Sequence, residues 1–507
     1  MKKTVLIIMI ITFLSKIIGF GREIVLSYFF GVSSISDAYL ISLTIPGVIF
    51  GLIGTGIATS YIPMVSRIIK ESGEIAGSKF TSNFTNVVLI IITILLALGM
   101  IFTEQIVKFF AIGFVDETLS MAIKFTRISL WGMYFTALVN IFSGYLQIKN
   151  NYIIPALVAF PLNAIIIISI MISAQGNYVF LAIGTLIATA SQFLMMVPFI
   201  VKQGFDYSFI VNFKDDRMIK TLYIALPVII GTSVNQINTL VDKTIASSIA
   251  VGGISALNYA SMLNTFIHGL IVVSIVTVIY PLISGFANNQ NYAGIRKTLK
   301  ESINIINLFL LPVTFGALIF SEEVVKMLFG RGAFDTTAVS MTSNVLFFYA
   351  FGMVGAGLRE VLARAFYSMQ NTKIPMINAS IGMLINIILN ILLSRYLGVS
   401  GLALATSIAA TFTTILLFIS LRKKIGPFGM KQISISFLKI LFASSIMGGL
   451  AKLSFNYLTA SLSQNFSLLI AIGVGAISYF VIIYFMKIED VDVIVVAIKK
   501  KLGRGAA

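Results

Sequence analysis

The chain has 507 residues, of which 58% are hydrophobic and 11% are charged, with a mean hydropathy of +0.99 and a net charge of +17. A soluble domain usually carries about 25% charged residues, so a water-exposed surface cannot be built from this composition. The absence of cysteine excludes disulfides and thiolate metal sites, and the single histidine, His268, argues against zinc sites built on histidine.

Apolar runs long enough to cross a membrane follow one another along the chain. A membrane-spanning helix needs about twenty mostly apolar residues. The runs are too long for a β-barrel, whose strands have about ten residues of alternating polarity. The first run outlasts the apolar region of a signal peptide and no cleavage site follows it, so we expect it to remain. The sequence predicts an all-α polytopic membrane protein with about fourteen spans, near 4–29, 37–64, 84–107, 121–147, 152–174, 178–201, 219–248, 256–285, 301–320, 338–366, 375–395, 400–421, 434–456 and 466–486.

Lysine and arginine gather in alternate loops, such as the one with Arg67, Lys70 and Lys79, and in the C-terminal tail, where Lys499 to Lys501 and Arg504 lie. Loops rich in these residues stay in the cytoplasm. We therefore expect a multi-pass protein of the bacterial cytoplasmic (inner) membrane with both termini in the cytoplasm. The basic charge then faces anionic membrane lipids, and nucleic acid is not expected as a partner.

Two stretches about 220 residues apart resemble each other. Residues 145–155 read YLQIKNNYIIP and residues 367–375 read YSMQNTKIP, and an apolar helix with asparagine follows each. This repeat predicts two six-helix lobes, at 1–203 and 204–424, followed by two helices and a basic cytoplasmic tail at 425–507. Parallel repeats of this kind are a transporter architecture, with the site expected near the membrane midplane between the lobes.

Three ionisable residues lie in the first span, in SKIIGFGREIV: Lys16, Arg22 and Glu23. Such residues are costly in a membrane and are functional candidates by default. Because an arginine fork matches phosphate, Arg22 and Lys16 are predicted to bind a phosphate group while Glu23 orients Arg22. Gly19 and Gly21 could let the helix bend here. The alternative is a structural Arg–Glu pair or snorkelling near the helix end.

Two further residues are candidates for substrate binding. Asp37 stands at the start of the second span, where it either caps the helix or serves function. Lys243 lies in the seventh span and could add a cation for the phosphate.

A carboxylate with amide and hydroxyl oxygens suits a hard cation or a proton. The residues of this candidate Na⁺ or proton-coupling site are Asp242, Asn386, Asn390 and Thr406. The alternative is a hydrogen-bond network that only packs helices. No other cofactor is expected, and because no phosphate-binding loop or nucleotide fingerprint is present, neither is ATP.

Polar residues elsewhere are given structural roles. Glu360 and Arg364, four residues apart, are predicted to form an intrahelical pair. Glu322, Glu323 and the segment GRGAFD at 330–335 are predicted to form an exposed loop.

Several of these stretches together resemble the MurJ lipid II flippases, a family of the multidrug/oligosaccharidyl-lipid/polysaccharide exporter superfamily. The resemblance covers nearly the whole chain through residue 424. It rests on SKIIGFGREIVLSYFFGVSSISDAYLISLTIP at 15–46, SVNQINTLVD at 233–242, ISALNYAS at 254–261, LFGRGAFD at 328–335 and GLREVLARAFYSMQNTKIP at 357–375.

The resemblance implies a transporter, not an enzyme. Such proteins move lipid II, an undecaprenyl pyrophosphate carrying the peptidoglycan building block, from the cytoplasmic to the outer leaflet by alternating access around a cationic cavity. Membrane potential, with sodium in some members, is thought to drive the cycle. Carried over by position, Arg22 and Asp37 match family residues, and Lys16 stands where arginine is usual. Asp242 matches an acidic position considered for sodium.

Two departures make the expected cavity less cationic than usual in the family. The motif Tyr-Ala-(Asp/Ser)-Arg ends in Met262 here, and the basic pair after Ile-Pro in the second span is absent, since 45–52 reads IPGVIFGL. The departures leave a related alternative open, a flippase for another undecaprenyl-pyrophosphate oligosaccharide such as an O-antigen or capsule unit. A cation-coupled drug exporter would not need the phosphate-binding residues. A membrane glycosyltransferase or phosphatase would need clustered acids or histidines, which the sequence lacks.

Overall fold

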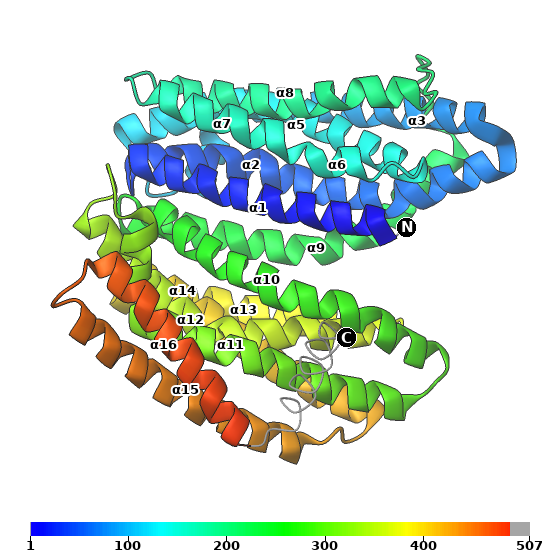
Figure 1. Ribbon diagram of the computed structural model, residues 1–507. Coiled ribbons are helices and arrows are strands. Elements are labelled where there is room, and N and C mark those ends of the chain that lie inside the picture. The colour runs from blue at the N-terminus through cyan, green and yellow to red at the C-terminus, as the bar shows by residue number, and fades with distance from the viewer. Residues whose placement is uncertain (1, 487–507) are drawn as a thin grey trace. The chain divides into compact units, whose positions relative to one another are not determined.

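The computed structural model describes residues 2–486, apart from the side chains of 2–5, 52, 53, 55, 58, 227, 228, 230–232, 234 and 235. The predicted basic tail, with Lys499 to Lys501 and Arg504, lies outside the described residues. The regular elements in the described chain are helices (Figure 1): α1 Lys2–Phe30, α2 Ser34–Gly56, the π-helical turn η1 Ile57–Tyr61, α3 Ile62–Ile101, α4 Thr103–Phe110, α5 Asp116–Ile148, α6 Ile153–Leu157, α7 Ala159–Ser173, α8 Val179–Lys202, α9 Asp216–Ile249, α10 Gly253–Asn288, α11 Tyr292–Phe329, α12 Thr336–Ser368, α13 Lys373–Leu397, α14 Val399–Ile425, α15 Met430–Leu458 and α16 Gln464–Phe485.

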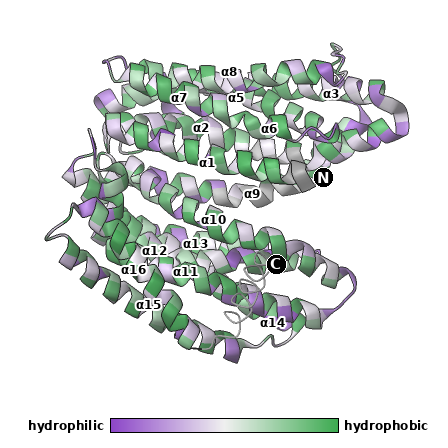
Figure 2. Cartoon of the chain, viewed as in Figure 1, coloured by the Kyte–Doolittle hydropathy of each residue, from purple (hydrophilic) through white to green (hydrophobic). Residues whose placement is uncertain are grey.

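The predicted all-α polytopic membrane fold is confirmed. Within the described residues, eleven helices are long and apolar enough to cross a membrane. The three remaining predicted spans correspond to α1, α5 and α9, which are long helices with more polar residues. Hydrophobic residues dominate the middle of the long helices, and hydrophilic residues gather around their ends (Figure 2).

Two predicted boundaries differ from the structure for identifiable reasons. The predicted third span began at residue 84, but α3 begins at Ile62 and is broken only at Gly73, where φ is 85°. The predicted fifth span is divided into α6 and α7. Pro161 causes this division, because a proline has no N–H to bond the carbonyl four residues back, and that carbonyl belongs to Leu157, where α6 ends.

The prediction of an exposed loop at Glu322 and Glu323 is wrong. Both residues belong to α11, which continues to Phe329. The carboxylate of Glu323 pairs with the ammonium group of Lys452 on α15 at 2.7 Å. This ion pair, with only 13% of the Glu323 side chain exposed, accounts for an acidic residue at the end of a membrane helix.

The two repeated stretches form the same turn. Asn150 and Gln370, 220 residues apart, both have positive φ, 60° and 56°. The N–H groups of the following asparagines, Asn151 and Asn371, bond to the carbonyl five residues earlier, at 2.8 and 2.9 Å. Each asparagine side chain then accepts a bond from the N–H three residues later, at 3.4 and 3.2 Å. The repeat therefore marks one kind of helix-ending turn, which the chain also forms at Gln290 and Asn291, where the Asn291 N–H bonds to the Phe286 carbonyl at 2.9 Å.

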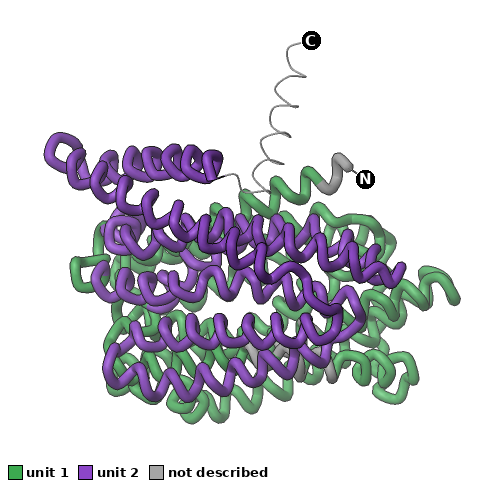
Figure 3. Tube along the Cα trace, turned by 90° about the horizontal axis from the view of Figure 1, so that it is seen from below, with its two compact units in different colours: residues 1–256, 331–338 green, residues 257–330, 339–507 purple. Residues whose placement is uncertain are grey.

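The chain folds into two compact units (Figure 3). Unit 1 contains residues 1–256 and 331–338, and unit 2 contains residues 257–330 and those from 339 onward. The predicted lobe boundary at 203/204 differs from this division by one helix, because α9 belongs to unit 1. Close packing explains the difference: a Cβ added at Gly56 at the end of α2 would lie 3.0 Å from Ile229 and 3.1 Å from Ala225 of α9.

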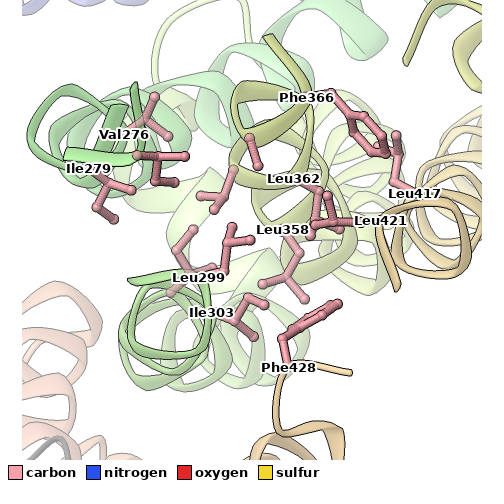
Figure 4. Close-up of a cluster of buried hydrophobic side chains, with 14 of the residues drawn as sticks. Val276, Ile279, Leu299, Ile303, Leu358, Leu362, Phe366, Leu417, Leu421 and Phe428 are labelled. Atoms are coloured by element: carbon pink, nitrogen blue, oxygen red, sulfur yellow. The ribbon is translucent and has the colours of Figure 1, made fainter. Parts of the chain in front are cut away.

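Each unit has its own apolar core. In unit 1 one core joins α3 and α5 through residues such as Phe84, Ile92, Leu130 and Ile141. In unit 2 the core joins α10, α11, α12 and α14 (Figure 4), with Val276, Ile279, Leu299, Ile303, Leu358, Leu362, Phe366, Leu417, Leu421 and Phe428.

The segment 331–338 is part of unit 1 because it packs against the end of α1. The Ala333 N–H donates to the carbonyl of Tyr28 at 2.8 Å. A Cβ at Gly332 would lie 2.3 Å from that same carbonyl oxygen, and a Cβ at Gly31 would lie 2.3 Å from the carbonyl oxygen of Ala333. Both glycines have positive φ, 62° and 56°. The prediction of an exposed loop at 330–335 is confirmed, since Arg331, Gly332, Ala333 and Asp335 are exposed between α11 and α12, and the backbone contacts with α1 hold this loop in place.

Asp37 on α2 caps the N-terminus of α10, whose first residues, up to Ala256, belong to the same unit. Its carboxylate is 1% exposed and accepts bonds from the N–H of Gly252 at 2.8 Å and from the N–H and hydroxyl of Ser255, both at 2.7 Å. These groups lie at the N-terminus of α10, where free N–H groups attract a carboxylate. Gly252 has φ 82°, and a Cβ there would lie 2.2 Å from the Val32 side chain. The cap thus fixes α2 against the start of α10.

The cap predicts a large loss of stability for Asp37→Ala. Removing a buried acceptor of three bonds should lower the free energy of unfolding by about 3 kcal/mol. The measurement is the thermal unfolding midpoint in detergent. Asp335→Ala is the matched control, because Asp335 accepts a single cap bond from the Ala338 N–H at 2.7 Å and its loss should cost about 1 kcal/mol. Equal shifts for the two variants would contradict the assignment.

The contact of 331–338 with α1 predicts that Gly332→Ala also destabilises the protein. The left-handed backbone alone costs about 1–2 kcal/mol with a Cβ, and the approach to the Tyr28 carbonyl adds to it. Gly449→Ala on α15 is the control, since a Cβ there meets no atom within 4 Å. Unfolding should occur at lower temperature in the first variant, and at the same or higher temperature in the second. An unchanged midpoint for Gly332→Ala would exclude the close approach.

Candidate functional site

Arg22 and Glu23 of α1 form an ion pair within unit 1. Arg22 Nη2 lies 2.6 Å from Glu23 Oε1, with 28% of the arginine and 8% of the glutamate side chain exposed. α1 runs through Gly19 and Gly21 as one helix without a break. One nitrogen of the guanidinium faces Glu23, which leaves most of its five N–H donors for an anion.

Lys16 has a different environment from Arg22. Its side chain is exposed and forms no ion pair with the described part of the chain. Six residues of helix separate the two, which is about 9 Å along the axis. Lys16 is therefore a free cation, whereas Arg22 is held in a fixed pair.

Tyr39 connects this pair to α8. The hydroxyl of Tyr39, a residue that is 2% exposed, lies 2.8 Å from Thr185 Oγ1. Thr185 donates its own proton to the Leu181 carbonyl at 2.9 Å, so Tyr39 donates to Thr185. Arg22 and Glu23 both act electrostatically on the Tyr39 hydroxyl, which places α1, α2 and α8 around one polar region.

Lys243 on α9 adds a second cation held by α2. Its ammonium group donates to Thr44 Oγ1 at 2.6 Å, and Thr44 donates in turn to the Leu40 carbonyl at 2.6 Å. The carboxylates of Glu23 and Asp37 lie within electrostatic range of Lys243. Two cations and two carboxylates therefore balance in this part of unit 1, which is what an interior poor in water requires.

Asp37 was predicted to be a substrate ligand or a cap of its own helix. The structure places its carboxylate in the cap of α10, with three donors bound to it. A carboxylate used in this way holds the helices that carry the cations and has little capacity left for a ligand. We therefore assign it a positioning role.

The residues predicted to bind Na⁺ are divided between the two units. Asp242 lies on α9 in unit 1, whereas Asn386 and Asn390 on α13 and Thr406 on α14 lie in unit 2. Asn386 Nδ2 donates to Thr406 Oγ1 at 3.1 Å, and Asn390 Nδ2 donates to Asn386 Oδ1 at 2.8 Å.

Two oxygens that would bind the cation are thus already acceptors of hydrogen bonds. These bonds join α13 to α14, as a packing network would. The Na⁺ site stays a prediction, because an amide or hydroxyl oxygen that accepts one hydrogen bond keeps a second lone pair for a cation.

Sequence reasoning missed several polar residues of the site and one cation elsewhere. Tyr39, Thr44 and Thr185 carry no charge, so only the tertiary contacts single them out. Arg359 on α12 is an ionisable residue inside a span. The rule that such residues are functional candidates, which singled out the charges of α1, would have found it. The neighbouring prediction is confirmed: Arg364 pairs with Glu360 at 2.7 Å, one helical turn apart.

Comparison with known proteins gives the same family along nearly the whole length. Residues 26–473 match the family model described as "Lipid II flippase MurJ". The chain is 32% identical to the "Lipid II flippase MurJ" of Thermosipho africanus, over 93% of this chain and 94% of that protein. It is 26% identical to the "Probable lipid II flippase MurJ" of Vibrio cholerae, over 97% of each.

The fold matches solved structures of the same kind. A structure titled "Lipid II flippase MurJ, inward closed conformation" aligns with a TM-score of 0.83 and 30% identity, covering 95% of this chain and 98% of that one. An inward-facing multidrug resistance MATE family transporter of the MOP superfamily aligns with a TM-score of 0.68 and 16% identity, covering 83% and 98%, and shares the fold alone. The chain belongs to the lipid II flippase MurJ family.

Proposed function

We propose that this protein carries lipid II, the undecaprenyl-pyrophosphate-linked precursor of peptidoglycan, from the inner to the outer leaflet of the bacterial cytoplasmic membrane by alternating access. Family membership supports the class of substrate. The observation that carries the proposal to particular residues is the pair of cations, Arg22 and Lys243, held inside membrane helices of unit 1. Charges are kept in such places at a cost of several kcal/mol, and an anionic substrate explains the cost.

The pyrophosphate is the group that these cations suit. The guanidinium of Arg22 offers a planar fork that matches two phosphate oxygens, and Lys243 offers a point charge. Lys16, exposed on the same helix, supplies a further cation for an approaching anion. The polyprenyl tail needs no polar contact, because it can remain in the lipid while the head group crosses.

Glu23 makes the binding of the anion reversible. Its carboxylate binds one nitrogen of the Arg22 guanidinium, so a phosphate that binds the remaining N–H groups competes with it for the positive charge. The attraction between opposite charges is strong where water is scarce, so a binding site of two unopposed cations would release a pyrophosphate slowly. A carboxylate that returns to Arg22 lowers the barrier to release.

We place both chain termini in the cytoplasm, because lysine and arginine gather in the loops and the tail that this orientation puts there.

A flippase for another undecaprenyl-pyrophosphate oligosaccharide is the second candidate. Met262 on α10 supports it, because the resemblance places an arginine of the lipid II flippases at this position. The two substrates share the pyrophosphate and differ in the sugars, so the phosphate-binding residues would be the same.

Complementation tests the proposal. The protein is expressed in a bacterium depleted of its own lipid II flippase, and lipid II in the outer leaflet is measured. We expect rescue of growth and of surface lipid II. An inserted, abundant protein that rescues neither would contradict the lipid II assignment and favour the second candidate.

Arg22→Ala should abolish transport, because a small apolar side chain offers the pyrophosphate no donor. Arg22→Lys should retain only a small part of it, since a point charge does not replace the fork. The readout is lipid II in the outer leaflet at equal protein abundance. The matched control is Arg67→Ala, since Arg67 also pairs with a glutamate, Glu71 at 2.6 Å, but is exposed. Normal transport by Arg22→Ala would remove α1 from the mechanism.

Thr44 is predicted to be a positioning residue that acts through Lys243. Thr44→Val keeps the shape but leaves the ammonium group without its acceptor, so transport should fall on the order of tenfold. Thr44→Ser keeps the hydroxyl and should restore transport. If valine and serine give equal transport, the hydroxyl has no role in holding Lys243.

A further inference from the structure

The connection between α8 and α9, residues 203–215, contains no helix or strand but is tied to α3. Asn83 on α3 donates its amide to the Asn212 carbonyl at 3.1 Å and accepts from the Asn212 N–H at 2.7 Å. Asn86, one turn further, donates to the Ile210 carbonyl at 2.9 Å and accepts from the Tyr207 hydroxyl at 2.8 Å. The segment therefore has a fixed place on the surface of unit 1.

The residues of this segment alternate between two faces. Residues two apart lie on the same side of an extended chain. Backbone groups of Ser208, Ile210 and Asn212 bond to α3. The side chains between and beside them are exposed: Tyr207 at 53%, Phe209 at 84%, Val211 at 40% and Phe213 at 51%. An aromatic and apolar face of this kind is unfavourable in water and indicates an interaction surface.

The segment lies beside the ends of membrane spans. The span α8 ends at Lys202, directly before it. The ring of Phe205 packs on Phe142 and Tyr145, with centroids 5.2 and 5.3 Å apart, and both of these residues belong to the last two turns of α5. Since α5 and α8 are the neighbours of the segment, their ends place it at the boundary of the membrane and not in water beyond it.

The exposed face also continues a lipid-facing surface. Ile187, Leu194 and Val201 on α8 follow one another at seven-residue spacing, which puts them on one helix face, and all three are exposed. An apolar face on the outside of a membrane span is covered by lipid. The segment follows Val201 in the chain, so the same lipid is the nearest occupant for its aromatic side chains.

Backbone groups of the segment exclude a position deeper in the membrane. The N–H and carbonyl groups of Phe209 and Val211 form no hydrogen bond within the described chain. In hydrocarbon each such group costs several kcal/mol, whereas water among the lipid headgroups supplies the missing partner. The exposed charges of Lys202, Asp206 and Lys214 are also solvated there, and the two lysines suit a layer of lipid phosphates.

We propose that residues 205–213 form an interfacial anchor, in which Tyr207, Phe209 and Phe213 lie among the lipid headgroups and the first carbons of the acyl chains. Aromatic residues favour this layer because their rings are apolar and their edges are polar. In the orientation proposed above, the leaflet is the cytoplasmic one. The hydrogen bonds to α3 connect the anchor to the body of unit 1, so it fixes the depth of that unit in the membrane whatever the protein transports.

The absence of cysteine from the chain makes a labelling test direct. Phe209→Cys and Phe213→Cys each carry one nitroxide spin label in the full-length protein, in nanodiscs of phosphatidylethanolamine and phosphatidylglycerol. Electron paramagnetic resonance then measures collisions with oxygen, which concentrates in lipid, and with a water-soluble nickel chelate. The ratio of the two collision rates gives the depth of the label. Both side chains are exposed, so the variants should unfold at the wild-type temperature.

Two further variants on α3 provide the references. Ser72→Cys is exposed beside the break at Gly73, about 15 Å along the helix from Asn83, and reports water. Ile94→Cys is exposed in the apolar part of the same helix and reports hydrocarbon. The ratios at 209 and 213 should lie between these two references.

Three results would overturn the anchor. A ratio at 209 and 213 equal to that at Ser72→Cys would place the face in water. A ratio equal to that at Ile94→Cys would place it in hydrocarbon. Labels that collide with neither reagent, in nanodiscs or in native membrane vesicles, would identify protein as the cover of this face in place of lipid.

Discussion

The carboxylate of Asp37 is the interaction on which unit 1 depends. It lies out of water and is stabilised by three donors at the start of α10, so α2 cannot shift relative to that helix end without exposing an unpaired charge. The other polar contacts of the site start from the same helix. Tyr39 reaches α8 and Thr44 holds Lys243 of α9. A cap that would be a minor feature in a soluble protein therefore sets the positions of the residues that bind the substrate.

Glycine serves two different purposes in this structure. At Gly31, Gly252 and Gly332 the backbone has positive φ and another chain segment lies within 2.3 Å of the place a Cβ would take, so glycine is needed for the contact itself. Gly56 on α2 has ordinary helical geometry but also serves packing, because its missing side chain lets α9 come close. Gly47 on the same helix differs, since the missing side chain there leaves an open cavity. The first use stabilises the fold and the second leaves space inside unit 1.

The candidate site combines charged and neutral polar groups. Arg22 pairs with Glu23, and Lys243 has the carboxylates of Glu23 and Asp37 within electrostatic range. Neutral hydroxyl groups hold the same region together, since Thr44 accepts from Lys243 and Thr185 accepts from Tyr39. These hydroxyl groups leave little trace in a count of charges, although they fix the residues that carry the charge.

The sequence by itself determined the fold class and the main cation. Long apolar runs can only be helices in lipid, because every backbone N–H and carbonyl needs a partner there, and most predicted spans match a helix within a few residues. Arg22 and Glu23 were found because charge inside a span is rare. The repeated turns at Asn150 and Gln370 were visible as similar strings of residues.

Only the tertiary structure decided which polar groups act together. Asp37 caps α10, more than 200 residues away, and the segment after α11 contacts the end of α1, so neither contact follows from local spacing. The amides of Asn386 and Asn390 have the residue types of a cation site, but they bond to their neighbours. The polar residues of the cavity wall are serine, threonine and asparagine, which occur in many membrane helices. Their function depends on which face each helix presents, and packing determines that face.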